Sequence, residues 1–203
     1  MRYTLSEGRL VKEVYLKNQA RRLNYLKQHI SISINDTWYD VGRTDSKNIL
    51  REYLENHYGK NVIAYDGDLN YKTTFPDSFA DVITHLEVIE HLLNPLLNLK
   101  ECYRILRPGG RLYLTTPNDY SLILKLEHLL SRKLESHFHQ FNEYELKWLL
   151  TVAQLRQFTV KKFKKTQRGY VARFCNNSFF VEAIKWNTAK TVNILKRIVV
   201  QYI

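Results

Sequence analysis

The segment that decides the fold covers residues 81–118 and reads DVITHLEVIEHLLNPLLNLKECYRILRPGGRLYLTTPN. Residues 81–84 predict a short strand. Asn94-Pro95 predicts a helix start, because an Asn side chain accepts from the unpaired N–H groups of a first turn and proline has no N–H to leave unpaired there. Arg107-Pro108-Gly109-Gly110 predicts the end of that helix. Residues 112–116 predict a second strand, so this segment is the strand–helix–strand unit of a parallel sheet.

The same alternation continues on both sides of this segment. Before this segment, a strand pattern that ends at a glycine is followed by a helix pattern that also ends at a glycine, and then by an apolar strand pattern. After it, Asn142 begins a capping box, which indicates the start of another helix. We therefore expect a three-layer α/β domain with a mainly parallel sheet. The predicted strands are 38–42, 61–65, 158–163 and 178–184, and the predicted helices are 9–30, 46–58, 120–130, 142–152 and 187–203.

Length and composition predict one domain over residues 1–203, with a helical cap at 1–34, a core at 35–185 and a closing helix at 186–203. The chain has 203 residues, of which 44% are hydrophobic, which suffices for one packed core. No run of about 18 uncharged apolar residues exists, which excludes a transmembrane helix. Two cysteines form no disulfide framework, and no secretory leader is visible, so we expect a reduced cytoplasmic protein.

The net charge of +11 is concentrated at the two ends. Residues 1–30 carry +5 and residues 156–203 carry +10, whereas residues 31–155 carry −4. The basic ends leave nucleic acid open as a partner, although lysines that protect a strand edge are the favoured explanation of the run at 161–165. The amphipathic closing helix is typical of core packing or of a dimer face, and a membrane-surface helix is the alternative.

The residues of 81–118 resemble the class I S-adenosylmethionine-dependent methyltransferases, in the broad group with EVIEHL, LRPGG and TTPN motifs. The resemblance extends over roughly residues 37–185. It implies a Rossmann-like, doubly wound, mainly parallel sheet of the class I methyltransferase type. Only 15 residue steps separate Asp66 from Asp81, so we expect the sheet to lack one edge strand and its helix.

The resemblance also implies S-adenosylmethionine as cofactor. The first strand and its loop would cradle the methionine end, an acidic residue after the second strand would hold the ribose, and Asp68 would take the adenine side. The implied cofactor-binding residues are Asp40, Gly42, Asp66, Asp68, His85 and Leu86. The loop at 40–46 keeps only the first of the three glycines usual in the family.

A Glu/His cluster forms the second chemical feature. Glu87, Glu90 and His91 would share one face of a helical turn, and His139 could approach from a later loop. Carboxylates with imidazole suit Mg²⁺ or Mn²⁺, which would lower the pKa of a substrate hydroxyl. The alternative is that these side chains only brace the loop. Glu87, His91 and His139 are also the candidate catalytic residues.

Three functional hypotheses follow from these features. The first is methyl transfer from S-adenosylmethionine to an oxygen of a small-molecule or glycan-type acceptor. The second is a metal-assisted RNA ribose 2′-O-methyltransferase, motivated by the Glu/His cluster. The third is a methyltransferase fold that has lost catalysis and serves as a binding protein, motivated by the missing glycines.

Overall fold

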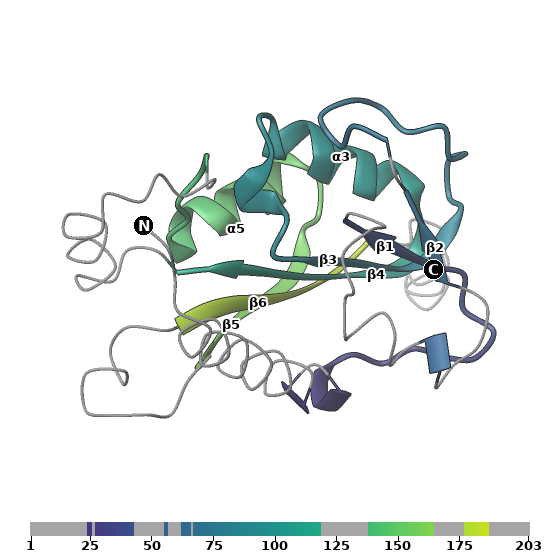
Figure 1. The fold of residues 1–203 in the computed structure, drawn as a ribbon, viewed down its shortest axis with the longest axis horizontal. Helices are drawn as coiled ribbons and strands as arrows, with labels where there is room; N and C mark the ends of the chain where they lie inside the picture. Colours follow the sequence, from purple (N-terminus) through teal and green to yellow (C-terminus); the bar gives the residue numbers. More distant parts are fainter. Residues whose placement is uncertain are drawn as a thin grey trace, which may run out of the picture.

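The described part of the chain forms one open, twisted sheet (Figure 1). The computed structural model describes residues 24–25, 27–42, 55–56, 62–65, 67–118, 138–164 and 177–186. Within these ranges the sheet has six strands in the order β2-β1-β3-β4-β6-β5. The strands are β1 (Trp38–Val41), β2 (Val62–Ala64), β3 (Ala80–Leu86), β4 (Leu106–Pro117), β5 (Gln157–Lys164) and β6 (Asn177–Ile184).

The sheet is mainly parallel, which confirms the prediction. Strands β2, β1, β3 and β4 run parallel to one another, whereas β6 lies antiparallel between β4 and β5. Residues 67–79, which connect β2 to β3, contain neither a strand nor a helix. β2 is therefore the edge of the described sheet, and the expected loss of an edge strand and its helix is confirmed.

Two asparagines begin the two described long helices, as the sequence predicts. Asn94 accepts a hydrogen bond from the Leu97 N–H at 3.0 Å and starts α3 (Pro95–Ile105). Asn142 exchanges reciprocal bonds with Glu145, a complete capping box, and starts α5 (Glu143–Val152). A short 3₁₀ turn, η1 (Ile89–His91), precedes α3. No helix in the described ranges has the length and apolarity needed to cross a membrane.

The turn at residues 107–110 differs from the prediction. The helix already ends at Ile105, and the chain enters β4 directly at Leu106. Residues 107–110 form an irregular excursion in the ladder, between the pairs Ala80–Leu106 and Val82–Arg111. A Cβ on Gly110 would lie 2.9 Å from the Arg107 carbonyl oxygen and 3.0 Å from that of Asp81, so only glycine fits this close approach.

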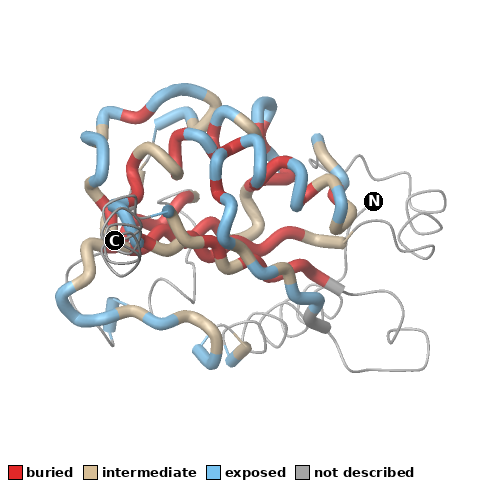
Figure 2. The backbone as a smooth tube through the Cα atoms, turned by 180° about the vertical axis from the view of Figure 1, so that it is seen from behind, coloured by how far each residue is buried: buried red, intermediate tan, exposed pale blue. Residues whose placement is uncertain are grey.

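The sheet buries both of its faces (Figure 2). Helices α3 and α5 cover one face (Figure 1), where the larger core includes Tyr39, Ile83, Leu99, Leu114 and Phe179. On the other face Trp38, Val82, Tyr113 and Phe180 pack against residues before β1, including Tyr25 and Ile30. The predicted helices 120–130 and 187–203, and most of 9–30 and 46–58, lie outside the described residues.

Candidate functional site

The carboxyl ends of β1 and β3 lie side by side and bring a buried carboxylate to this edge of the sheet. Asp40 pairs in register with Thr84 and is only 6% exposed. The Thr84 hydroxyl donates to Asp40 Oδ1 and accepts from the Trp38 indole N–H at 2.9 Å. Because an indole N–H can only donate, the single hydroxyl proton of Thr84 must point to Asp40. The carboxylate orientation is thus fixed by the neighbouring strand.

Gly42 follows β1 with a φ of +157°, a backbone conformation that L side chains rarely adopt. A Cβ there would lie 3.6 Å from Val88 Cγ2, so backbone conformation rather than crowding favours glycine. Open backbone beside a carboxylate, at the carboxyl end of a parallel strand, is the setting in which α/β folds bind nucleotide-like ligands. The rest of this loop, residues 43–46, lies outside the described residues.

The end of β3 places its side chains differently from the prediction. His85 is fully buried, and its Nε2 lies 2.8 Å from Asn98 Oδ1 under α3. Burial lowers the pKa of His85 to about 4, against a smaller raising effect of the Asn98 bond, so the imidazole is neutral at pH 7. Only the main chain of His85 is therefore placed to border a ligand. Leu86, by contrast, is partly exposed.

Glu87 adopts a left-handed conformation, with a φ of +56°, at the turn after β3. Its N–H donates to the Thr115 carbonyl of β4 at 2.9 Å, which holds this conformation in place. Left-handed backbone costs about 1 kcal/mol or more for a non-glycine residue and persists where the surrounding structure enforces it. The turn therefore holds the candidate catalytic Glu87 in one orientation at the strand ends.

Asp68 lies in an exposed loop beyond β2. Its Oδ1 accepts from the N–H and the side-chain amide of Asn70, at 2.9 and 2.8 Å. The Asn70 side chain in turn accepts from the N–H groups of Leu93 and Asn94, just before α3. Asp68 is thus tied to the same edge of the sheet as Asp40. Asp66, the predicted ribose ligand, lies outside the described residues.

The four predicted metal ligands do not assemble into a metal site. In the described ranges, which include all four, no group of three or more His, Cys, Asp and Glu side chains has a geometry that could hold a metal ion. Glu90 is buried and accepts from the Thr116 hydroxyl, and its nearest oxygen lies 4.0 Å from His91 Nε2. Its carbonyl accepts from the N–H groups of Phe138 and His139. These contacts of Glu90 fit the alternative given above, in which the side chains brace the loop.

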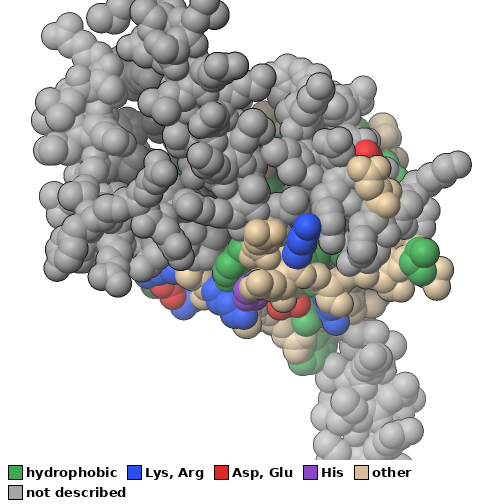
Figure 3. All heavy atoms as spheres, turned by 60° about the horizontal axis from the view of Figure 1, so that its bottom comes forward, with side chains coloured by type: hydrophobic (Ala, Val, Ile, Leu, Met, Phe, Trp, Pro, Cys, Tyr) green, Lys and Arg blue, Asp and Glu red, His purple; other side chains and the backbone are tan. Residues whose placement is uncertain are grey.

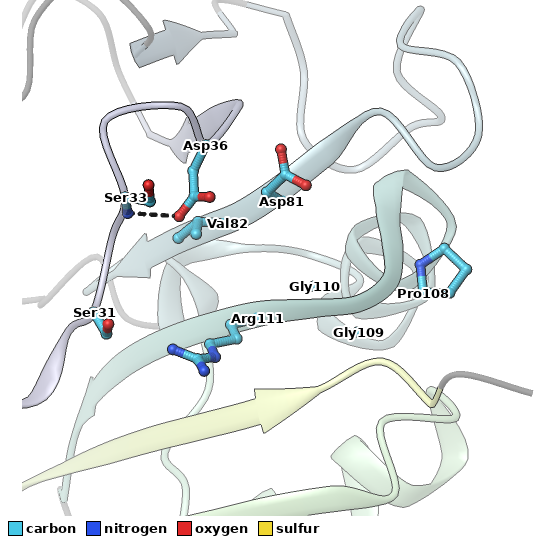
Figure 4. Close-up of a pocket in the computed structure, with 9 residues that line it drawn as sticks. All are labelled: Ser31, Ser33, Asp36, Asp81, Val82, Pro108, Gly109, Gly110 and Arg111. Carbon is cyan, nitrogen blue, oxygen red and sulfur yellow. Dashed lines mark hydrogen bonds between the residues drawn. The ribbon is translucent and has the colours of Figure 1, made fainter. Parts of the chain in front are cut away.

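A polar cavity of about 370 Å³ lies at the opposite, amino end of the strands (Figure 4). Its two carboxylates already have protein partners: Asp81 accepts from Arg107 and from the Thr37 N–H, and Asp36 accepts from the Ser33 N–H. Ligands of doubly wound folds bind at the carboxyl ends instead. This cavity is therefore not the candidate site.

The described charges on the face opposite α3 and α5 do not form a patch of one sign. Figure 3 shows Lys and Arg side chains next to Asp or Glu side chains there. On the side that carries α5, Lys162 of β5 pairs with Glu143 of that helix at 3.0 Å. Most of the basic residues of 156–203 lie outside the described residues, so the nucleic-acid hypothesis stays a prediction.

A family model described as a methyltransferase domain matches residues 19–160, more than half of the chain. The chain belongs to this methyltransferase family. The resemblance to class I S-adenosylmethionine-dependent methyltransferases is thereby confirmed. A solved S-adenosylmethionine-dependent methyltransferase of Archaeoglobus fulgidus has the same fold, with a TM-score of 0.62, 16% identity and 82% of this chain and 94% of that chain covered.

Curated relatives match a shorter part of this methyltransferase-family chain. The ubiquinone biosynthesis O-methyltransferase of Parvibaculum lavamentivorans is 34% identical over 89 residues, covering 40% of this chain and 30% of that protein. The protein of the same name from Pseudomonas putida strain W619 is 36% identical over 74 residues, covering 34% and 31%. The chain aligns with less than a third of the length of the first relatives it matches.

Sequence reasoning missed two residues that shape the site, Thr84 and Asn98. The sequence around Thr84 predicts only a strand, and the Thr84 hydroxyl acts on Asp40, which lies 44 residues earlier in the chain. Asn98 interrupts the apolar stripe of α3 between Leu96 and Leu99, and it is 2% exposed. A polar residue on a buried helix face was the signal that could have identified it, because buried amides need partners.

Proposed function

We propose that this protein transfers a methyl group from S-adenosylmethionine to a hydroxyl oxygen of a small-molecule or glycan-type acceptor. The observation that carries the proposal is the oriented Asp40 carboxylate beside Gly42, at the carboxyl ends of β1 and β3. Membership of the methyltransferase family supports the cofactor, and the relatives named as ubiquinone biosynthesis O-methyltransferases support oxygen as the methyl acceptor.

The residues at this edge fit the cofactor. S-adenosylmethionine supplies a methyl group activated on a sulfonium. Asp40 and Gly42 would hold its methionine end, since a carboxylate attracts an ammonium group and glycine lets backbone approach. Asp66 would hold the ribose hydroxyls and Asp68 the adenine. His85 and Leu86 would border the adenosine, His85 through its main chain only.

Rate enhancement in such a transfer comes mainly from orientation. The acceptor oxygen forms a bond to the methyl carbon as the carbon–sulfur bond breaks, and the hydroxyl proton passes to a base. Glu87, His91 and His139 are the candidates for that base, since all three lie near the ends of β3 and its following turn. The four predicted metal ligands do not assemble in the described residues, so none of these roles depends on a metal ion.

Calorimetric titration with S-adenosylmethionine and S-adenosylhomocysteine tests the proposal. We expect micromolar binding and, for Asp68→Ala, an affinity about tenfold or more lower, as expected for loss of a hydrogen bond to a charged group. Asp77→Asn is the matched control, because Asp77 is an exposed carboxylate in the same connection between β2 and β3. No binding at millimolar cofactor would reject the enzyme and favour the catalytically degenerate binding protein.

Methyl transfer itself needs a separate assay. Small phenols, glycans and RNA oligonucleotides are supplied with labelled cofactor, and the methylated atom is identified by mass spectrometry. Transfer to a small hydroxyl compound supports the proposal. Transfer confined to RNA ribose and abolished by EDTA would replace it with the metal-assisted RNA hypothesis.

A further inference from the structure

Asn98 joins the end of β3 to the loop that carries Asp68. Its Oδ1 lies 2.8 Å from His85 Nε2, and its Nδ2 lies 2.9 Å from the Leu69 carbonyl oxygen. Both His85 and Asn98 are buried, at 0% and 2% exposure. A buried amide that pairs with a buried imidazole and with a main-chain carbonyl forms a rigid connection, because the buried imidazole bond is not open to exchange with water.

Chemistry fixes the direction of these two bonds. A carbonyl oxygen can only accept, so the amide nitrogen of Asn98 must face Leu69 and its oxygen must face His85. The oxygen then needs a donor, which places the proton of the neutral imidazole on Nε2. The hydrogen bonds therefore run in one direction, from His85 through Asn98 to the Leu69 carbonyl.

Apart from the packing of Leu69 against the larger core, the loop has little other support. Residues 67–79 contain no strand or helix, so no ladder hydrogen bonds hold residues 68–70 in place. The second connection is Asn70, whose side chain accepts from Leu93 and Asn94 at 2.7 and 3.1 Å. These Asn70 bonds are exposed, whereas the Asn98 bond is part-buried. Asn98 is thus the more shielded of the two connections.

We propose that His85 and Asn98 are positioning residues that hold the 68–70 loop against the cofactor site, so that Asp68 and the Leu69 main chain recognise the edge of the adenine. This inference rests on the proposed function for its ligand. The structural part of the inference, that Asn98 holds the loop in place, does not depend on the proposed function. In this chain the two side chains replace the support that the absent edge strand and helix would give the loop.

Hydrogen exchange of the ligand-free protein tests the structural half. Asn98→Leu keeps the volume and shape of the side chain and removes both bonds. We expect the amides of Asn70 and Tyr71, which pair with Asp68 at 2.9 and 3.2 Å, to exchange about tenfold faster or more. Cys102→Ala is the matched control, because Cys102 is buried one turn further along α3 and its side chain donates only a long, weak bond to Asn98 Oδ1, at 3.8 Å.

The exposed connection gives a second variant if Asn98→Leu does not fold. Asn70→Ala removes the bonds to Leu93 and Asn94, and the side-chain bond to Asp68, without creating a buried cavity. It should leave Asn98 as the remaining side-chain hydrogen bond from α3 to residues 68–71, with faster exchange confined to that loop. Unchanged exchange of these amides in Asn98→Leu, or equal acceleration in Cys102→Ala, would overturn the inference.

Ligand discrimination tests the recognition half. S-inosylhomocysteine carries an oxo group in place of the adenine 6-amino group, so Asp68 loses a hydrogen-bond donor to accept from. The unaltered protein should prefer S-adenosylhomocysteine about tenfold or more, and Asn98→Leu should reduce this preference several-fold while Cys102→Ala keeps it. Retention of the full preference in Asn98→Leu overturns the inference and leaves the proposed function standing. Absence of binding in the unaltered protein overturns the proposed function and the proposed recognition of adenine. Hydrogen exchange then still tests whether Asn98 holds the 68–70 loop.

Discussion

The hydroxyl of Thr84 on β3 donates a hydrogen bond to the carboxylate of Asp40 on the adjacent strand β1. The Trp38 indole donates to the same hydroxyl, so a single proton direction is possible. Asp40 is buried, and a buried carboxylate needs fixed donors to stay ionised. Thr84 therefore sets the orientation of the carboxylate that the proposed function assigns to the methionine end of the cofactor.

Thr84→Val should weaken both folding and cofactor binding. The substitution keeps the volume but leaves the Trp38 N–H and one Asp40 oxygen without this partner, at a cost of about 1–3 kcal/mol for each buried group. We expect a lower free energy of unfolding in urea and at least about tenfold weaker binding of S-adenosylhomocysteine by calorimetry.

Thr115→Val is the matched control for this substitution. Thr115 is also fully buried, on the strand next to β3, but its hydroxyl has no hydrogen-bond partner within the described residues. Replacement by valine should therefore be neutral or stabilising. Equal losses in the two variants would show that the Thr84 hydroxyl has no special role.

The strands and helix starts of this fold could be predicted because their signals are local. Asn94-Pro95 and the Asn142 box act within one helical turn, and the structure confirms both. The course of residues 107–110 could not be predicted this way. It depends on the approach of the Asp81 and Arg107 carbonyls to Gly110, which joins strands separated in sequence.

In the site too, features that depend on neighbouring residues could be predicted, whereas features that depend on residues distant in sequence could not. Asp40 and Gly42 stand at the end of the predicted strand 38–42, and Asp68 follows the predicted strand 61–65, so the pattern placed all three towards the carboxyl edge. His85 also stands at a strand end, but its side chain faces α3, where Asn98 holds it 13 residues further along the chain. The Glu/His spacing predicted a shared face on a helical turn, whereas Glu87 lies before the turn with left-handed backbone.

Loss of the capping box at α5 should lower stability by about 1 kcal/mol. Asn142→Ala removes the acceptor for the Glu145 N–H and leaves one more unpaired donor in the first turn. Thermal or urea unfolding measures the change. Asn142→Asp, which retains a capping oxygen, should stay within a few tenths of a kcal/mol of the unaltered protein, and a loss as large as that of Asn142→Ala would contradict the capping role.

The imidazole of His85 should remain neutral well below the ordinary histidine range. Burial lowers its pKa from 6.5 to about 4, so the folded state resists protonation that the unfolded chain accepts. Between these values the unfolded state binds more protons, and the free energy of unfolding therefore falls as the pH is lowered from 6.5 towards 4, by up to about 1.4 kcal/mol per pH unit.

Nuclear magnetic resonance of the His85 ring checks this directly. The ring should show the Nε2-protonated neutral tautomer at pH 7 and no titration step near pH 6.5. Asn98→Leu removes the Oδ1 acceptor and should make this ring signal sensitive to pH or broadened by exchange. A His85 titration midpoint near 6.5 in the unaltered protein would contradict the buried, hydrogen-bonded arrangement.

Glu101 should contribute an acid-sensitive part of the stability of α3. Its Oε1 accepts from the Thr73 N–H, the Thr73 hydroxyl and Arg104, at 2.7, 2.8 and 2.6 Å. Burial alone would raise the pKa of this carboxyl, but the hydrogen bonds from Arg104 and Thr73 outweigh burial and lower it. The unfolded state therefore binds the proton more readily, and the stabilisation is present above the ordinary Glu pKa of 4.5.

That stabilisation is lost as the pH falls through the lowered pKa of the folded state. Glu101→Gln keeps the shape but places an amide against the Arg104 donors, so we expect about 1–3 kcal/mol lower stability at pH 7 and a shallower loss of stability on acidification. Urea unfolding at a series of pH values measures both. Glu143→Gln is the control, because the Glu143 pairs with Lys147 and Lys162 are solvent-exposed and add little. An acid dependence of Glu101→Gln equal to that of the unaltered protein would show that Glu101 is not the group responsible.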